Sequence, residues 1–138
     1  MSFAYLLKRF RVKKGLSLRK LGELSRIDHA YISRLEKKEK QSPSEEVVEK
    51  LVRGLGLDDR DAWLLGFGAR FHKYLDPGMI RYIIENAEIT QQECSWAMAV
   101  RYRVPGKLDY PRLFGCARQL MTTVDDYLVT SNSAGAGT

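Results

Sequence analysis

The chain of 138 residues has little of what disulfide-rich or metal-binding proteins require. It contains two cysteines, two histidines and four prolines. Two cysteines are too few for a disulfide framework, and Cys94 and Cys116 lack the close spacing of metal ligands. We therefore expect both to be reduced thiols in the core, rather than a redox pair or a metal site.

The sequence also lacks a long apolar run. No stretch approaches the roughly eighteen apolar residues that cross a bilayer. The first residues, Met-Ser-Phe-Ala-Tyr-Leu-Leu-Lys, do not show the basic-then-apolar order of a secretion signal. We expect a cytoplasmic protein with no membrane partner.

Catalytic patterns are missing too. Neither His29 nor His72 has a neighbouring metal ligand, and no nucleophile, base and orienting group occur together. There is no glycine-rich loop of the kind that holds phosphate groups. The sequence thus predicts a protein that is not an enzyme and carries no cofactor or metal.

Charge, by contrast, is plentiful and unevenly placed. The chain has a formal net charge of +6. Residues 1–57 hold fourteen basic and seven acidic side chains, whereas residues 58–138 hold nine and ten. All of the basic excess lies in the N-terminal part, which indicates a polyanionic partner for that part alone.

The apolar pattern is helical throughout, with no strand-like alternation and no internal repeat. It predicts an all-α protein: a compact five-helix unit followed by a smaller helical region. Helix-start residues and glycine or proline stops mark the expected boundaries. The expected helices are 3–14, 17–24, 28–37, 44–55, 58–67, 76–87, 90–100 and 110–124, with Leu18, Leu21 and Leu24 as the apolar stripe of the second.

The third expected helix has two unlike faces. At about 100° per residue, its polar and small side chains fall within one sector of about 140°, and its large apolar ones fall opposite. A helix of this kind packs one side on its domain and presents the other to the major groove of DNA. The outward set is His29, Ala30, Ser33, Arg34 and Lys37, and the inward set is Tyr31, Ile32 and Leu35.

The order and spacing of several motifs resemble a known family. Residues 3–67 are similar to the lambda-repressor-like helix-turn-helix domain of the Xre/Cro family of transcriptional regulators. The resemblance implies that the third helix enters the major groove and that the loop after it lies on the phosphates. The matching residues are Gly15-Leu16-Ser17, Leu21, Ile27, Tyr31-Ile32-Ser33-Arg34-Leu35-Glu36, Pro43-Ser44 and Leu55-Gly56-Leu57.

The same resemblance implies roles for individual residues. It implies an ion pair between Arg11 and Glu36 that ties the first helix to the third. It implies base-edge contacts from Asp28, His29, Ala30, Ser33 and Arg34. It implies phosphate contacts from Arg19, Lys20, Tyr31, Lys37, Lys38 and Lys40.

For three of these residues, the chemistry of the side chain also suggests a role other than DNA contact. Asp28 suits a helix cap better than a base contact, because a carboxylate repels the phosphates unless it accepts from a cytosine amino group. For His29, a contact with DNA and a side chain merely exposed to solvent explain its position equally well. The ring of Tyr31 faces the core sector, so that its hydroxyl alone would reach a phosphate.

Three positions depart from the family pattern. Leu18 stands where a phosphate-binding glutamine is common, and Gly22 stands where alanine packs the two helices together. Arg26 stands where glycine commonly supplies a positive φ, so we expect mild strain there or a turn that differs in detail.

We expect three segments: a helix-turn-helix DNA-binding domain over 1–69, a helical dimerisation or regulatory region over 70–130, and a disordered tail over 131–138. The predicted function is a DNA-binding regulator, a repressor that binds a palindromic operator as a homodimer through residues 76–124. One alternative is an antitoxin whose C-terminal region neutralises a protein partner. Another is a ligand sensor, although no convergent polar cluster marks a pocket.

Overall fold

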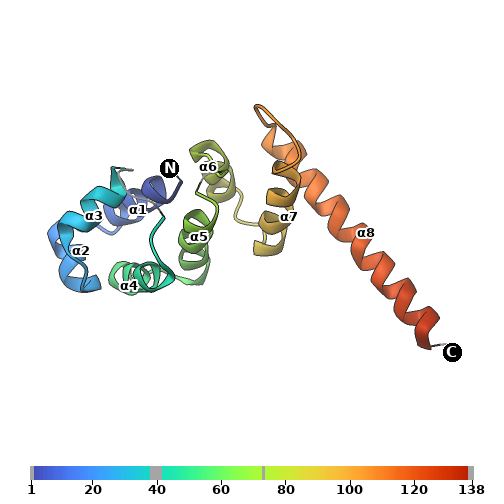
Figure 1. Ribbon diagram of the computed structural model, residues 1–138, viewed down its shortest axis with the longest axis horizontal. Coiled ribbons are helices and arrows are strands. Elements are labelled where there is room, and N and C mark those ends of the chain that lie inside the picture. Colours follow the sequence, from blue (N-terminus) through green and yellow to red (C-terminus); the bar gives the residue numbers. More distant parts are fainter. Residues whose placement is uncertain (1, 38–41, 73, 137–138) are drawn as a thin grey trace. The chain divides into compact units, whose positions relative to one another are not determined.

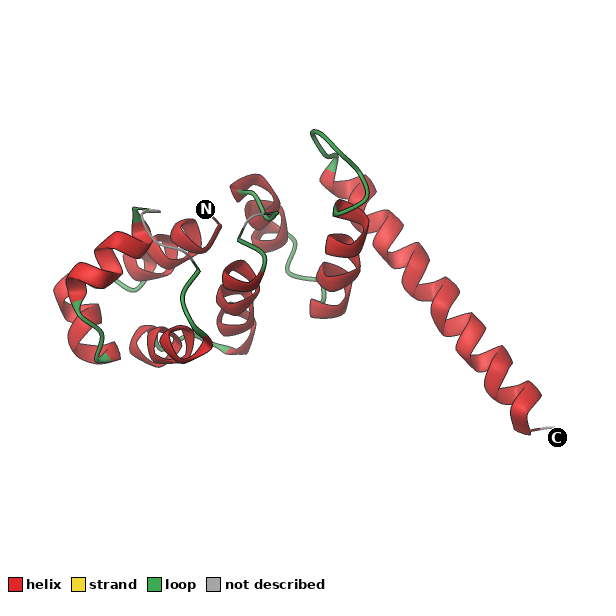
Figure 2. Ribbon diagram, viewed as in Figure 1, coloured by secondary structure: helices red, strands yellow, loops and turns green. Residues whose placement is uncertain are grey.

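The computed structural model describes residues 2–37, 42–72 and 74–136, with side chains described as far as residue 132. These residues form eight helices and no strand (Figures 1 and 2), which confirms the predicted all-α class. None of the helices in the described part is long and apolar enough to span a membrane. The helices are α1 (Ser2–Lys13), α2 (Leu18–Ser25), α3 (His29–Glu36), α4 (Glu45–Leu55), α5 (Asp59–Arg70), α6 (Pro77–Glu85), α7 (Gln91–Arg101) and α8 (Tyr110–Ala136).

The helix starts follow from side-chain caps. A side-chain oxygen accepts a hydrogen bond from a first-turn amide at Ser17, Asp28, Ser44, Asp58 and Thr90. Each cap supplies an acceptor to an amide that has no partner within its helix. Of the two adjacent aspartates at the start of α5, Asp58 is the cap.

Residues with positive φ follow three of the described helices: Gly15 after α1, Arg26 after α2 and Gly56 after α4. Gly56 adopts φ 62° after α4, a conformation that costs glycine little. The sequence pattern suggested that Gly54 also ends this helix, but Gly54 lies inside α4. Its role is packing, because a Cβ there would lie 2.8 Å from the Cβ of Ser25 in α2.

Arg26 ends α2 in the left-handed conformation, with φ 59° and ψ 36°. Its amide donates to the carbonyl of Gly22, so the turn closes as it would with glycine. The expected positive φ is present, and the Cβ of Arg26 makes this conformation costly.

Replacing Arg26 with glycine is therefore expected to stabilise the protein by about 1 kcal/mol, because relief of the left-handed strain outweighs the added freedom of the unfolded chain. Urea denaturation followed by Trp63 fluorescence, in a Trp96→Phe background, reports the N-terminal part. Arg26→Ala is the matched control, since it removes the same side chain but keeps the Cβ. Equal stability of the Ala and Gly variants would contradict the strain.

The chain divides into two compact units, Met1–Arg81 and Tyr82–Thr138, so the first unit extends beyond the boundary at residue 69 that we expected. Leu75, Met79 and Ile80 are buried, which places apolar side chains of the α5–α6 connection and α6 in a core. Helices α1 to α5 supply the rest of the core of the first unit. Its buried side chains include Phe3, Leu6, Leu7, Phe10, Leu21, Ile32, Leu35, Leu51, Leu55, Leu64, Leu65 and Phe67.

The stripe expected for α2 needs correction. Leu21 is fully buried, but Leu18 is half-buried and Leu24 is 48% exposed. Ser25 is buried in place of Leu24, and its hydroxyl donates to the carbonyl of Leu21 at 2.6 Å. A small polar side chain fits there because α4 approaches α2 closely at Gly54.

In the second unit, α7 packs on the first part of α8. Leu113, Phe114 and Ala117 of α8 are buried, and so is Cys94 of α7. Cys116 is exposed, so the expectation that both thiols are buried is wrong for this one.

Helix α8 is longer than expected. It continues to Ala136, and residues 131–136, which the sequence placed in a disordered tail, are helical. Once a helix is formed, each added residue gains a backbone hydrogen bond, so even small and polar residues extend it.

Candidate nucleic-acid interface

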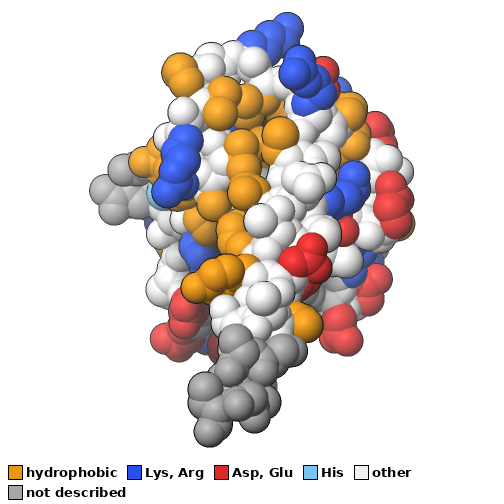
Figure 3. Space-filling model, turned by 90° about the vertical axis from the view of Figure 1, so that its right-hand side faces the viewer, with side chains coloured by type: hydrophobic (Ala, Val, Ile, Leu, Met, Phe, Trp, Pro, Cys, Tyr) orange, Lys and Arg blue, Asp and Glu red, His pale blue; other side chains and the backbone are white. Residues whose placement is uncertain are grey.

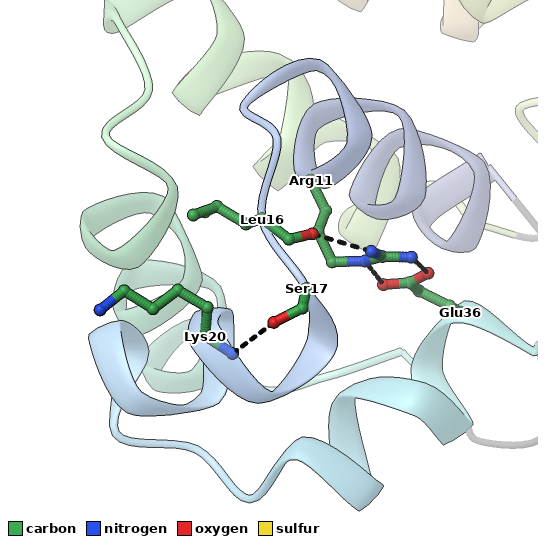
Figure 4. Close-up of polar contacts among 5 residues, drawn as sticks. All are labelled: Arg11, Leu16, Ser17, Lys20 and Glu36. Atoms are coloured by element: carbon green, nitrogen blue, oxygen red, sulfur yellow. Dashed lines mark hydrogen bonds and ion pairs between the residues drawn. The ribbon is translucent and has the colours of Figure 1, made fainter.

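Arg11 and Glu36 join α1 to the end of α3 (Figure 4). The guanidinium Nε and Nη2 of Arg11 donate to the two carboxylate oxygens of Glu36 at 2.7 and 2.9 Å. Arg11 also donates through Nη1 to the carbonyl of Leu16, just before α2. The ion pair implied by the family resemblance is thus present and holds three segments with one side chain.

The pair is largely shielded from water, with the side chains 15% and 7% exposed. The hydrogen bond to Glu36 raises the pKa of Arg11, and burial opposes that shift. A cation with a raised pKa contributes stability below its unfolded pKa and loses it only above. Arg11 therefore stays charged throughout the range in which proteins fold.

Helices α2 and α3 meet at a close contact around Gly22. A Cβ at this position would lie 2.9 Å from the carbonyl oxygen of Ile27 and 3.2 Å from the Cβ of His29. Only a residue without a Cβ permits this approach. The departure from the family pattern at Gly22 therefore has a structural reason in the close-set turn.

The two predicted faces of α3 are present. Ile32 and Leu35 are buried, and Tyr31 is half-buried. Ala30, Arg34 and the other outward residues are exposed except for Ser33, which is half-buried. The exposed residues of this face are His29, Ala30, Arg34 and Lys37.

Arg34 lies against a neighbour on its own helix. Its guanidinium carbon is 5.9 Å from the centre of the Tyr31 ring, within the range of a cation–π contact. The contact restricts a long side chain that would otherwise sample many rotamers. Arg34 is thereby partly preorganised while its side chain remains exposed.

Asp28 acts as the cap of α3. Its carboxylate accepts from the amide of Ala30 at 2.9 Å, which uses one of its oxygens. The capping alternative is therefore what the structure shows, although the exposed side chain keeps its second oxygen for other partners.

The residues named for phosphate contacts lie in different settings. Arg19 and Lys20 are exposed on α2, and Lys20 makes a loose ion pair with Glu23 at 3.8 Å. Figure 4 shows the Lys20 side chain pointing away from the Arg11–Glu36 pair. Lys38 and Lys40 lie outside the described residues.

An open depression lies where α2 meets the start of α3. Sequence reasoning did not include Glu23, whose carboxylate borders this depression beside the predicted DNA-contacting residues. The helical spacing of Arg19 and Glu23, four residues apart on α2, was the signal that places them side by side. The lining residues are Arg19, Gly22, Glu23, Ile27, Asp28 and His29.

The first helices have the order of a known DNA-binding unit: a capped α2, a tight turn and a short two-faced α3 tied back to α1. Residues 2–64 match the family model of a helix-turn-helix domain. This segment is a helix-turn-helix domain. Neither the comparison with curated proteins nor that with solved structures gave a match.

The helix-turn-helix assignment suggests how the helices described above would lie on DNA. In helix-turn-helix domains generally, the second helix of the motif enters the major groove and the first crosses the backbone. Such domains are typical of DNA-binding regulators, and the match is consistent with an Xre-like member. The five helices α1 to α5 followed by further helices agree with the fold expected from the sequence.

Proposed function

We propose that the chain is a sequence-specific DNA-binding regulator without enzymatic activity, and that it represses transcription by covering a promoter. The observation that supports this most is the exposed face of α3 in a helix-turn-helix domain, with Arg34 at its centre. The basic excess of residues 1–57 supplies the attraction to phosphates.

The proposal includes base contacts and phosphate contacts. Base edges are read from α3, and two parallel donors of Arg34 suit the acceptors of guanine. Phosphates are contacted by cations around it. The proposed base-contacting residues are Asp28, His29, Ala30, Ser33 and Arg34, and the proposed phosphate-contacting residues are Arg19, Lys20, Tyr31, Lys37, Lys38 and Lys40.

Binding as a dimer to a palindromic operator is part of this proposal. One recognition helix reads only a few base pairs, and two-fold symmetric proteins reach two half-sites about 34 Å apart. Residues 76–124 are the proposed dimerisation region.

The expected result for Arg34→Ala is loss of most discrimination between the operator and random DNA, worth about 1–3 kcal/mol, because a base contact is removed. For Lys37→Ala we expect weaker binding to both DNAs by a similar factor, and a salt slope reduced by about 1. Selection of bound sequences from a random pool gives the operator, and fluorescence anisotropy at several salt concentrations gives both affinities. Equal losses on specific and random DNA for Arg34→Ala would contradict its role.

An antitoxin is the second candidate, and the exposed apolar side chains of α8 favour it, because they leave room for a protein partner. The DNA-binding domain would then regulate the antitoxin's own expression. Co-purification of a small partner bound to residues 82–138 would support this reading over a repressor that acts alone.

A further inference from the structure

Helix α8 repeats one apolar pattern at intervals of seven residues, complete in two sets and ending on the polar Ser131 in a third. Each repeat places two adjacent side chains and a third one turn later on the same face. A seven-residue apolar repeat is the pattern of helices that pack along their length with other helices. The three sets are Leu113, Phe114 and Ala117; Leu120, Met121 and Val124; and Tyr127, Leu128 and Ser131.

Among the described side chains of α8, only the first repeat is fully buried, and Met121 and Val124 of the second are half-buried. Leu113, Phe114 and Ala117 are at most 4% exposed. In the second repeat Leu120 is 41% exposed, and in the third Tyr127 and Leu128 are 71% and 51% exposed. Burial thus falls steadily along a single face of one helix.

The lengths of the two helices explain where the packing stops. Helix α7 has 11 residues, and α8 has 27, which at 1.5 Å per residue are about 16 and 40 Å long. Glu93, in the first turn of α7, pairs with Arg118 of α8 at 3.0 Å. Since α7 begins at this level, the part of α8 after Arg118 has no cover from α7.

Figure 3 shows the same feature on the surface, where a band of hydrophobic side chains runs down to the C-terminal residues. The other side of this part of α8 carries Thr122 and Thr123, which donate to the carbonyls four residues before them. Apart from the exposed Val129, this other side is polar, and we call the apolar face of the uncovered part of α8, residues 120–131, the distal stripe.

The charges beside the distal stripe argue against nucleic acid and membrane surfaces as its partner. Residues 119–138 carry two acidic side chains, Asp125 and Asp126, and no basic one. DNA and anionic lipid headgroups both attract basic helices. An apolar stripe with acidic flanks suits another protein helix instead.

We propose that the distal stripe pairs with the distal stripe of a second copy of this chain, with the two α8 helices antiparallel. This inference rests on the dimer of the proposed function and extends its contact from residues 76–124 to residue 131. A two-fold axis lets the same surface serve both copies. Each distal stripe then also reaches the α7–α8 pair of the other copy, which makes a four-helix arrangement.

The orientation follows from Arg118 and Asp125, which occupy the same position in successive repeats. If Met121 of one copy lies opposite Val124 of the other, antiparallel helices bring Arg118 opposite Asp125 of the second copy, twice by symmetry. Parallel helices would place Asp125 beside Leu120 of the second copy. Arg118 also pairs with Glu93 of its own chain, and its side chain is 46% exposed, which leaves part of the guanidinium for a second carboxylate. Flanking charges of this kind set helix orientation, and they favour the antiparallel pair.

The first test measures association without DNA, so that its outcome is independent of the DNA-binding proposal. We expect sedimentation equilibrium to show a dimer of the full chain at micromolar concentration. Leu128→Glu should raise the dimer dissociation constant at least about tenfold, because it places a charge in each half of the interface. Thr130→Glu adds the same charge outside the stripe and should leave the constant within about twofold.

Leu128 is half-exposed in a single chain, so Leu128→Glu should leave the helical circular dichroism signal of the monomer unchanged. A monomeric wild-type chain at 100 µM, or equal effects of Leu128→Glu and Thr130→Glu, would overturn the inference. The DNA-binding proposal would survive that outcome if the chain still selected a sequence from a random pool.

Cross-linking tests the orientation. In a Cys116→Ser background, an equal mixture of Met121→Cys and Val124→Cys chains should oxidise to a mixed disulfide dimer, and neither chain alone should do so efficiently. A parallel pair predicts the reverse, with each chain cross-linking to its own copy. That result would overturn the antiparallel arrangement.

Charge reversal gives an independent check. Asp125→Arg should weaken the dimer several-fold by facing Arg118 of the second copy, whereas Asp125→Asn, which only removes the charge, should weaken it less. Equal effects of the two substitutions would contradict the proposed register.

Discussion

Arg11→Met is expected to destabilise the helix-turn-helix domain by about 3 kcal/mol, because it leaves a buried carboxylate without its cation. Glu36 is only 7% exposed, and both of its carboxylate oxygens accept from Arg11. The carbonyl of Leu16 loses a donor at the same time. Urea denaturation followed by Trp63 fluorescence in the Trp96→Phe background measures the loss.

The double variant Arg11→Met/Glu36→Leu distinguishes two causes of instability: an unpaired buried carboxylate, and the loss of the link between α1 and α3. Two apolar side chains of similar size remove the unpaired carboxylate, so we expect stability within about 1 kcal/mol of the wild type. A double variant as unstable as Arg11→Met would show that the pair acts by attaching α1 to α3 and not by compensating charge.

Gly54→Ala is expected to cost up to about 3 kcal/mol, because the added methyl meets backbone that cannot move alone. The new Cβ would lie 2.9 Å from the amide nitrogen and 3.0 Å from the Cα of Ser25. Helix α4 would have to move away from α2, and the packing of Leu21 and Leu51 in the core would loosen. The same fluorescence measurement gives the free energy of unfolding.

Gly66→Ala is the matched control. Gly66 also lies within a helix of the first unit, and a Cβ there would meet no atom within 4 Å. This substitution should stabilise by about 0.5–1 kcal/mol through helix propensity alone. Gly54→Ala as stable as the wild type would show that α2 and α4 adjust to each other freely.

Much of the first unit could be predicted because its signals are local. The caps at Ser17, Asp28 and Ser44 depend on residues three or fewer positions away, and the structure has them all. The two faces of α3 follow from helical periodicity in the same way. The helix-turn-helix assignment needed only this local information.

What could not be predicted depends on contacts between distant segments. Leu24 reads as core by spacing, yet Ser25 is buried because Gly54 lets α4 come close. The exposure of Leu120 and Leu128 likewise depends on where α7 begins. Periodicity shows which face of a helix is apolar but not how far along it the neighbouring helix extends.

Similar reasoning applies to the candidate site. His29, Ala30 and Arg34 are exposed as the pattern indicated, whereas Ser33 is half-buried. The cation–π contact between Arg34 and Tyr31 and the depression beside Glu23 arise from side-chain conformations that a sequence does not specify. The phosphate contacts of Lys38 and Lys40 stay a prediction.

The short length of α3 limits the number of base pairs that one copy of the proposed regulator could read. Its 8 residues span about 12 Å, or roughly four stacked base pairs at 3.4 Å each. A word of four letters recurs about every 256 positions by chance, among the millions of competing sites in a chromosome. If α3 reads DNA as proposed, one copy would match many chromosomal sites by chance, and binding at a single site would require more than one copy.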